Sequence, residues 1–430
     1  MLNILTPKVV RNIADQYKDL LGFGSYGMLC AYILCYLYGL ENFSDLVRTT
    51  PWTMSLSSIS RQMNAINPQN LNRAMRRLRA SVLKKVGKNP DDWVFAFDTT
   101  ANPKRVEKLI GGGHWADSRG CVFEGRTILV VVAINIKTGT TIPVAYAPCI
   151  KTKDDPENGK TAWKLLLELV DKLLEEGFPR LPLVGDSWFD GVEFFEELNS
   201  RGLKFSIELK SSRTATDSSQ LNAKWDQLVL HFREESKKQV IIGTNESKDS
   251  DSERRYVASK MLTIKTGKSN DKNKKTILVS VTAVYNNPAD KTPFAYYATN
   301  DFSKSASWQW RMSRLRWNIE VLFRDLKQNL NWGKSDSKTQ NGCDIEIVFP
   351  LLIIAYLRIN IDHENNMSIG LIINQIKQQE LIRNLDYIVK HNNSALFLKY
   401  KERMHPSRAC RKPLDRVAEG NMESDIFIAS

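Results

Sequence analysis

The 430-residue sequence contains few cysteines and arranges them in no metal-binding pattern. There is no C-x-x-C pair, and no histidine partner lies at zinc-finger spacing. The cysteines are Cys30, Cys35, Cys121, Cys149, Cys343 and Cys410. Their placement argues against a zinc finger or a disulfide framework and predicts reduced, mostly buried thiols in a cytosolic protein.

The N-terminal residues lack the layout of a signal peptide, because their apolar run is short and acidic residues follow it. Residues 20–40 are uncharged and about long enough to span a bilayer. Glycines, a serine and tyrosines within the run, and the lack of a flanking basic cluster, favour a buried helix or helical hairpin. A protein anchored to a membrane through this run is the remote alternative.

Acidic residues are in the minority: 48 Asp and Glu face 61 Lys and Arg, for a net charge of +13 and a pI near 9.3. This excess favours a polyanionic partner, either nucleic acid or an anionic membrane, without choosing between them. With 42% hydrophobic and 25% charged residues, the composition is that of a folded chain of two or three domains.

The most informative segment is 310–332, WRMSRLRWNIEVLFRDLKQNLNW. Its aliphatic residues recur at helical spacing and predict a face that packs on a core. They are Leu315, Ile319, Leu322, Leu326 and Leu330. A second face carries Arg316, Glu320, Phe323 and Lys327. There a carboxylate can hold a divalent cation while two basic groups meet phosphate charge. The alternative is a solvated helix with an ordinary i,i+4 salt bridge.

Two upstream aspartates each follow an apolar, strand-like run. Asp98 ends WVFAFD, and Asp186 follows LPLVG. Sites of α/β sheets assemble at the carboxyl ends of strands, so both aspartates are candidates. A lone aspartate at such a position is usually a helix cap or a turn residue, so the two have to be taken together with Glu320. Two local alternatives remain open: Asp190, read as a cap for the next helix, and Arg324, which could replace Lys327 as a phosphate contact.

Together these residues resemble the DDE transposases of bacterial insertion sequences, on the branch called insertion-sequence family four. That family has the signature Y-x2-R-x3-E-x6-K, which Arg316, Glu320 and Lys327 match. Ser313 stands at the tyrosine position, so the contact made by that tyrosine is not implied here. FDTT and VGDSWFDG map to the first two carboxylate motifs, and the resemblance covers roughly residues 90–360.

The pattern of elements predicts an α/β fold. Candidate strands at 93–98, 127–137 and 141–147 precede a helix at 160–176, a strand at 181–186, a helix at 191–201 and a strand at 203–209. Three antiparallel-compatible strands followed by helix–strand alternation is the order of an RNase H-like core. We expect a helical DNA-binding domain at 1–88, the core at 89–210 and 293–362, a β-rich insertion at 211–292, and a helical C-terminal segment at 363–430.

A basic helix is expected after Pro68 in the N-terminal domain. Arg73, Arg76 and Arg77 share one face of it at i, i+3 and i+4. Beside a transposase-like core, this face is a candidate reader of DNA ends. A solvated helix face is the alternative.

The resemblance implies an enzyme that binds two Mg²⁺ (or Mn²⁺) ions through Asp98, Asp186 and Glu320 and contacts DNA phosphate through Arg316 and Lys327. It would cleave DNA at the terminal inverted repeats of its element and transfer the 3′-OH into target DNA. It would work as a homodimer in a synaptic complex at the nucleoid, in the cytoplasm, without a membrane. The alternatives are a nuclease without strand transfer and a DNA-binding protein with an inert core.

Overall fold

The computed structural model describes residues 8–21, 26–39, 55–103, 109–116, 120–152, 155, 157–217, 225–233, 235–242, 253–265, 275–334, 339–360 and 368–392. In this part of the chain all strands join one twelve-stranded sheet. The strands are β1 Trp93–Pro103, β2 Gly113–Ala116, β3 Val122–Asn135, β4 Thr141–Pro148, β5 Leu183–Gly185, β6 Phe205–Leu209, β7 Thr214–Asp217, β8 Asp226–Gln227, β9 Lys238–Ile242, β10 Glu253–Lys265, β11 Thr276–Tyr285 and β12 Ala295–Thr299.

Five strands of the core lie in the order β4-β3-β1-β5-β6, and the short β2 also pairs with β3. β1, β3 and β4 are antiparallel neighbours, whereas β5 and β6 run parallel to β1. The predicted succession of three antiparallel strands and then helix–strand alternation is therefore confirmed. Residues 128–134 of β3 are buried throughout, as expected of a strand covered on both faces.

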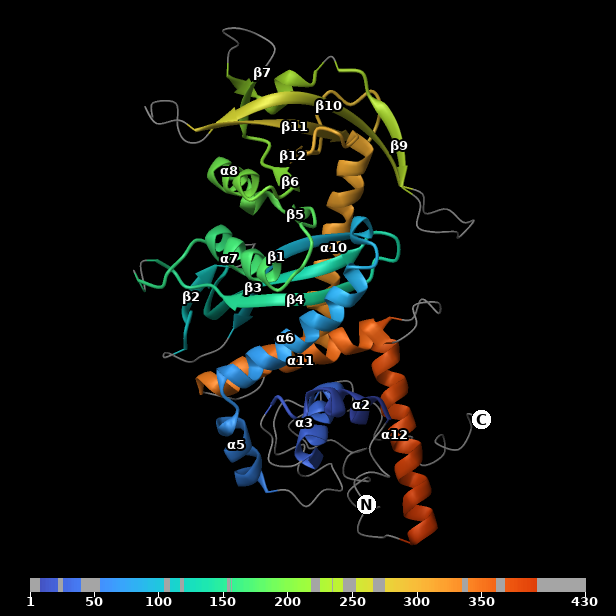
Figure 1. Cartoon of the computed structure of the whole chain (residues 1–430). Helices are drawn as coiled ribbons and strands as arrows, with labels where there is room; N and C mark the ends of the chain where they lie inside the picture. The colour runs from blue at the N-terminus through green and yellow to red at the C-terminus, as the bar shows by residue number, and fades with distance from the viewer. Residues whose placement is uncertain are drawn as a thin grey trace, which may run out of the picture.

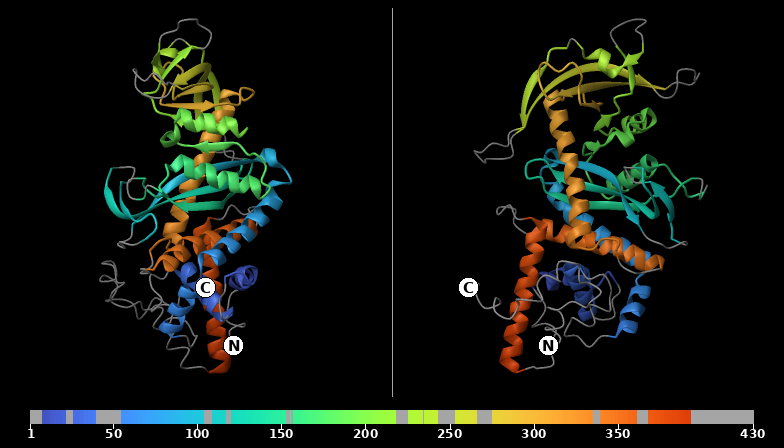
Figure 2. Two further views of the ribbon diagram at one scale, coloured as in Figure 1. Left: turned by 60° about the vertical axis from the view of Figure 1, so that its left-hand side comes forward. Right: turned by 180° about the vertical axis from the view of Figure 1, so that it is seen from behind.

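Different helices cover the two faces of this core (Figure 1). α7 (Ala162–Glu175) and α8 (Val192–Ser200) lie on one face, where Phe195 of α8 stacks on Phe205 of β6. The long helix α10 (Ala306–Asn329) crosses the other face and contacts β1, β5, β6 and β12. Figure 2 shows α10 from behind as a nearly straight rod that runs the height of the sheet.

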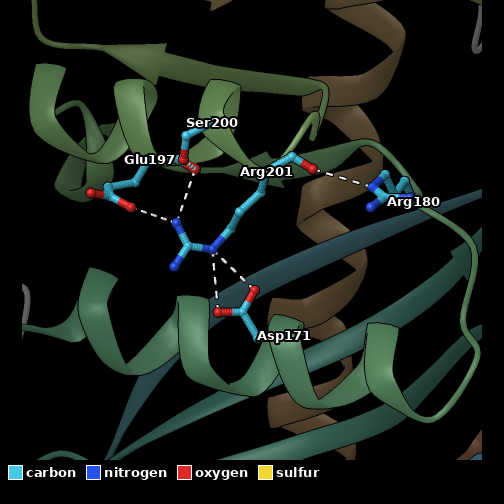
Figure 3. Close-up of polar contacts among 5 residues, drawn as sticks. All are labelled: Asp171, Arg180, Glu197, Ser200 and Arg201. Carbon is cyan, nitrogen blue, oxygen red and sulfur yellow. Dashed lines mark hydrogen bonds and ion pairs between the residues drawn. The ribbon is translucent and has the colours of Figure 1, made fainter.

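Arg201, directly after α8, ties the two covering helices together (Figure 3). Its Nε donates to Asp171 of α7 at 3.0 Å, and its Nη1 donates to Glu197 of α8. Arg180 in turn donates to the Arg201 carbonyl at 3.2 Å. Because β5 lies between these helices in the chain, the cluster helps to fix the strand that precedes Asp186.

The strands of the predicted β-rich insertion extend the core sheet. β12 pairs with β6 on one side and β11 on the other, and β11 continues to β10, β9 and β7. Segment 211–292 is thus rich in strands, as predicted. It is continuous with the core by backbone hydrogen bonds, a connection that the sequence did not indicate. Its short helix is α9 (Leu228–His231).

The described N-terminal elements are α2 (Lys8–Tyr17), α3 (Tyr26–Tyr38), α5 (Leu56–Ala65) and α6 (Pro68–Val86). α6 begins at the expected proline and is capped by Asn67, whose side chain accepts from the Asn70 amide at 3.0 Å. α3 is buried along almost its whole length, as the buried-helix reading of 20–40 predicted. No helix among the described residues is both long and apolar enough to cross a membrane.

α6 is fixed to the core through Arg79, a member of its basic run that is only 5% exposed. Its Nη2 donates to Glu176, just after α7, at 2.7 Å. Lys85 donates to the Ile359 carbonyl of α11 (Gln340–Asn360) at 2.8 Å. The first helices therefore pack against the core through specific polar contacts as well as apolar ones.

The apolar run LLIIAYLRIN after Pro350 predicts a buried helix. That helix, α11, begins ten residues before the proline, at Gln340, and contains it. Proline removes one helical hydrogen bond, but side chains on both sides of it, such as Ile347 and Leu351, are fully buried and offset that loss. α12 (Ile369–His391) follows, and the expected segment beyond 392, with Cys410, lies outside the described residues. Of the described cysteines, Cys121 is exposed, and Cys30, Cys35, Cys149 and Cys343 are buried.

A pair of one-turn helices completes the elements. η1 (Pro90–Asp92) leads into β1, and η2 (Ser187–Phe189) follows β5.

Candidate active site

Asp98 lies within β1, on the sheet face that α10 covers. The prediction that the strand ends at Asp98 was wrong, because β1 continues to Pro103 in its pairing with β3. Phe97 points to the opposite face, where its ring contacts Phe194 of α8 at 6.2 Å between centroids. Because successive strand residues alternate between faces, Asp98 and Thr100 point toward α10. The Asp98 carboxylate accepts a hydrogen bond from the Thr99 amide at 2.7 Å, which holds it at the strand surface.

Asp186 follows β5, the strand that pairs in parallel with β1 through Ala96 and Val184. Two residues further along each strand, this register brings Asp186 beside Asp98. The Asp186 carboxylate also accepts from the Trp188 amide at 3.1 Å and so caps η2. The capping role suggested by sequence is present, and it orients the carboxylate at the carboxyl end of the strand.

Gly185 makes the close approach of β5 possible. A Cβ at this position would lie 2.4 Å from the Phe97 ring. No real side chain tolerates such a contact, so the residue before Asp186 has to be glycine for the ring to pack there.

α10 presents Arg316 and Glu320 to the two aspartates. Ser305 caps the start of the helix, and its hydroxyl accepts from the Trp308 amide at 3.2 Å. Arg316 Nη1 lies 2.9 Å from Glu320 Oε1 and 3.5 Å from Asp98 Oδ2. The i,i+4 salt bridge expected of a solvated helix does form, but here it faces the sheet and includes an aspartate from another element.

Lys327 is the third α10 side chain on this face. Its Nζ donates to the Thr100 hydroxyl at 2.7 Å, and burial lowers the pKa of Lys327. Between Glu320 and Lys327, the ring of Phe323 stacks on Trp332 at 5.9 Å. The predicted face of Arg316, Glu320, Phe323 and Lys327 therefore points inward, although Phe323 contributes to the core rather than to the polar site.

The carboxylates repel one another in a poorly solvated place. Burial, and then the charge of Asp186, raise the pKa of Asp98 to about 7, while Arg316 acts to lower it. Burial also raises the pKa of Asp186. Burial alone would lower the pKa of Arg316, but the carboxylates around it, led by Asp98 and Glu320, raise it. A site with this excess of negative charge favours additional cations.

Asp98, Asp186 and Glu320 supply the donor type that Mg²⁺ and Mn²⁺ prefer, namely carboxylate oxygen. They come from three elements and line one cleft, and among the described residues Asp98 and Glu320 form ion pairs with Arg316. Within the described ranges, no three His, Cys, Asp or Glu side chains stand close enough to form a metal site as they are. The cation between Asp98 and Glu320 is the Arg316 guanidinium, and the residues fit a divalent ion by their chemistry.

The site opens into a cleft of about 2100 Å³. Its basic lining residues are Lys151, Lys160, Arg316, Arg324, Lys327 and Lys334. On its wall, Trp188 stands next to Asp186 with 72% of its surface exposed. Cations around a carboxylate cluster suit a ligand that carries phosphates, because the carboxylates alone would repel it.

The sequence matches the family model of the transposase DDE domain over residues 126–357, more than half of the chain. The chain belongs to the DDE transposase family. The matched range contains Asp186, Arg316, Glu320 and Lys327, and Asp98 precedes it.

Among solved structures, the chain is similar to a piggyBac transposase in a synaptic complex with hairpin DNA, determined by cryo-EM. The two share 10% sequence identity with a TM-score of 0.45, over 95% of this chain and 76% of the other. This agreement is too loose to equate individual residues. No functionally curated protein matches the chain in sequence.

In this DDE transposase the structure brings together Asp98, Asp186, Arg316, Glu320 and Lys327. The predicted arginines of α6 lie outside the cleft. Arg73 and Arg76 are exposed, and Arg77 donates to the Gln16 carbonyl of α2 at 3.0 Å.

Of the two local alternatives, Arg324 lines the cleft and is exposed, so it stays available for phosphate. The prediction that Asp190 caps α8 was wrong. The residue at the N-cap position is Gly191, and the first turn of the helix receives no side-chain hydrogen bond from its cap. Asp190 is buried, with its Oδ1 3.0 Å from Arg213 and its Oδ2 accepting from the Lys210 amide at 3.2 Å. These two contacts hold the segment that follows β6 against Asp190.

Sequence reasoning missed Glu208, a fourth carboxylate near Arg316. Burial raises the pKa of Glu208, as do the charges of Asp186 and Glu320, while Arg316 opposes them. The strand FSIEL contained the signal: Ser206 and Glu208 alternate with apolar residues and so share the face opposite Phe205.

Proposed function

We propose that this DDE transposase cleaves DNA at the ends of an insertion sequence and joins the freed 3′-OH to target DNA. One observation carries the proposal: carboxylates from β1, β5 and α10 converge with Arg316 and Lys327 in one basic cleft. An inert DNA-binding protein would have no need to bury repelling carboxylates in this arrangement, which costs stability.

Asp98, Asp186 and Glu320 would hold two Mg²⁺ or Mn²⁺ ions. When bound, such ions activate the attacking oxygen and stabilise the leaving one. Arg316 and Lys327 would bind phosphate oxygens of the scissile strand, and Arg324 would meet a neighbouring phosphate. Thr100 holds Lys327 in the same cleft through its hydroxyl.

The covalent steps consist of two displacements at phosphorus. In the first, the oxygen of water bonds to phosphorus and the bond to the element's 3′ oxygen breaks, which frees a 3′-OH. In the second, this hydroxyl bonds to a target phosphorus and a target 3′ oxygen leaves. No net redox change takes place, and the same carboxylates serve both steps.

We further propose an assignment to the insertion-sequence family four branch, on the Arg316-x3-Glu320-x6-Lys327 spacing, with an RNase H-like core at 89–210 and 293–362. The core strand order and the position of α10 support this assignment. The remaining units would be the DNA-binding helices of 1–88, the insertion of 211–292 and the C-terminal segment of 363–430. The partners would be the terminal inverted repeats and target DNA, held by a homodimer at the nucleoid.

The test is a cleavage and strand-transfer assay with purified protein and DNA that carries the element's ends. Mg²⁺ should give 3′-OH ends that join to target DNA, and EDTA or Glu320→Gln should prevent both steps. Cleavage without joining would indicate a nuclease. Tight binding to the ends with no metal-dependent nicking would favour the inert DNA-binding protein and overturn the proposal.

A further inference from the structure

Glu208 faces the same side of the sheet as the candidate metal ligands. In β6, Phe205 stacks on Phe195 of α8, with ring centroids 4.5 Å apart. Glu208 is an odd number of residues away from Phe205 and therefore points to the opposite face, which α10 covers.

The strand register places Glu208 close to Asp186 and next to α10. β6 pairs in parallel with β5, with Gly185 opposite Ile207, so the residues that follow, Asp186 and Glu208, lie on adjacent strands. On the other side, Tyr297 of β12 stands directly opposite Glu208 and packs on Trp310 of α10 at 6.0 Å. Glu208 thus lies on the sheet between Asp186 and the first half of α10.

Arg316 is shared by more carboxylates than it can pair with at once. It contacts Asp98 and Glu320, and the charges of Asp186 and Glu208 act on it as well. Within the part of the chain that the structure describes, Glu208 forms no salt bridge, and it is not among the residues that line the cleft. It is a half-buried carboxylate whose charge acts on Arg316.

A metal ion and Arg316 compete for the same oxygens. A divalent ion on Asp98 and Glu320 repels the guanidinium, because two cations at contact distance in a poorly solvated site are strongly unfavourable. A guanidinium that leaves one carboxylate in such a site needs another, since an unpaired buried charge is costly. Glu208 is the available carboxylate that the ion does not use.

We propose that Glu208 is a positioning residue that receives Arg316 when metal binds to Asp98 and Glu320. The inference rests on the proposed function, since it requires a metal at these carboxylates. Arg316 would thereby stay at the cleft as a phosphate contact while it gives up the metal ligands. Glu208 itself would touch neither metal nor DNA.

The test is Mn²⁺ affinity without DNA, measured by calorimetric titration, so that the readout is independent of activity. Glu208→Gln should bind Mn²⁺ about tenfold more weakly. This is the lower end of the loss of metal affinity that follows when a residue that supports the metal ligands, without touching the metal, is replaced. Glu208→Asp should restore part of the affinity. Glu196→Gln, on α8 at the other face, is the matched control and should bind as wild type does.

A double-mutant cycle decides whether the effect passes through the arginine. In an Arg316→Gln background, Glu208→Gln should change Mn²⁺ affinity less than twofold. An equal loss in both backgrounds would mean that Glu208 acts directly on the metal, and unchanged affinity in the single variant would mean that it has no part; either result overturns the inference. Thermal unfolding of each variant checks that it is folded.

Asp186→Asn separates this inference from the proposed function. It should abolish Mn²⁺ binding if the site is a metal site at all. Loss in Asp186→Asn with wild-type affinity in Glu208→Gln overturns the Glu208 inference alone, whereas wild-type affinity in Asp186→Asn overturns the metal site itself.

Discussion

Lys327 donates a hydrogen bond to the hydroxyl of Thr100 at 2.7 Å, which fastens the helix that carries Glu320 to the strand that carries Asp98. Thr100→Val, a change of nearly equal volume, removes the acceptor. We expect it to lower the free energy of unfolding by roughly 1–2 kcal/mol, because a half-buried ammonium loses its partner. It should also reduce DNA cleavage several-fold. Urea denaturation and the cleavage assay measure the two effects.

Thr100→Ser is the matched control, because it keeps the hydroxyl and should retain most of both properties. A loss in the serine variant with wild-type stability and cleavage in the valine variant would show that the threonine methyl group, rather than the hydrogen bond, is what matters.

Asp98→Asn, Asp186→Asn and Glu320→Gln should each abolish cleavage while they leave binding to the element's ends nearly intact. Each variant keeps the side-chain shape and removes the negative charge that a metal ion needs. The measurements are metal-dependent nicking and a binding isotherm for the same DNA. Wild-type turnover in any one of them would remove that residue from the site.

Metal affinity should depend on pH through Asp98. Its pKa is raised to about 7 in the folded protein, so at lower pH the metal has to displace a proton. Mn²⁺ affinity should therefore increase as the pH rises toward 7 and level off above it. Calorimetric titration from pH 5.5 to 8 tests this, and affinity that is flat over the range would contradict it.

The stability of the metal-free protein should depend on pH in the opposite sense. Because the folded pKa of Asp98 lies above its ordinary value of 3.8, the folded state binds more protons than the unfolded state in this window. The Asp98 contribution thus lowers the free energy of unfolding as the pH rises from about 4 to 7. In urea denaturation, Asp98→Asn should flatten the slope of the free energy of unfolding against pH. An unchanged slope would show that other groups cause the pH dependence.

The arginine face of α6 should contribute to DNA affinity through phosphate charge. Combined replacement of Arg73 and Arg76 by alanine should weaken end binding and reduce the slope of log affinity against log salt by roughly one to two, at about 0.9 per phosphate contact. Arg77 is better left in place, because it also donates to the Gln16 carbonyl. Lys172→Ala, an exposed cation on α7, is the control. An unchanged salt dependence would show that this face is an ordinary solvated surface that does not contact DNA.

Gly185→Ala should destabilise the core and disturb Asp186. A Cβ there would overlap the Phe97 ring, and overpacking of this kind costs about 1–3 kcal/mol. Urea denaturation measures the loss. The double variant Gly185→Ala with Phe97→Leu should recover part of it, because leucine lacks the ring atoms that the Cβ would meet.

Local pattern was sufficient to predict the elements that position the site. The apolar run before Asp98, the helical spacing from Arg316 to Lys327 and the proline at the start of α6 each reflect a short-range rule, and a strand and two helices form there. The predicted start of α11 was wrong. Proline usually begins or ends a helix, but burial of the residues around Pro350 outweighs that tendency here.

Long-range pairing could not be predicted in the same way. The sequence does not reveal that β12 pairs with β6, and this pairing is what places Glu208 against Tyr297 and near Arg316. The role of Asp190 was missed for a similar reason, since Arg213 reaches it only after the chain turns back behind β6. Both residues depend on contacts that only the folded chain makes.

The length of α10 makes it a lever. At 24 residues it is about 36 Å long, and it runs from the end of β12 to the region of α11 and α12. Glu320 lies along this rod while Asp98 and Asp186 stay on the sheet beneath it. A small tilt of α10 at either end would change the distance from Glu320 to the two aspartates. DNA bound far from the cleft, at an end of this helix, would therefore control when the carboxylates reach the geometry that the reaction needs.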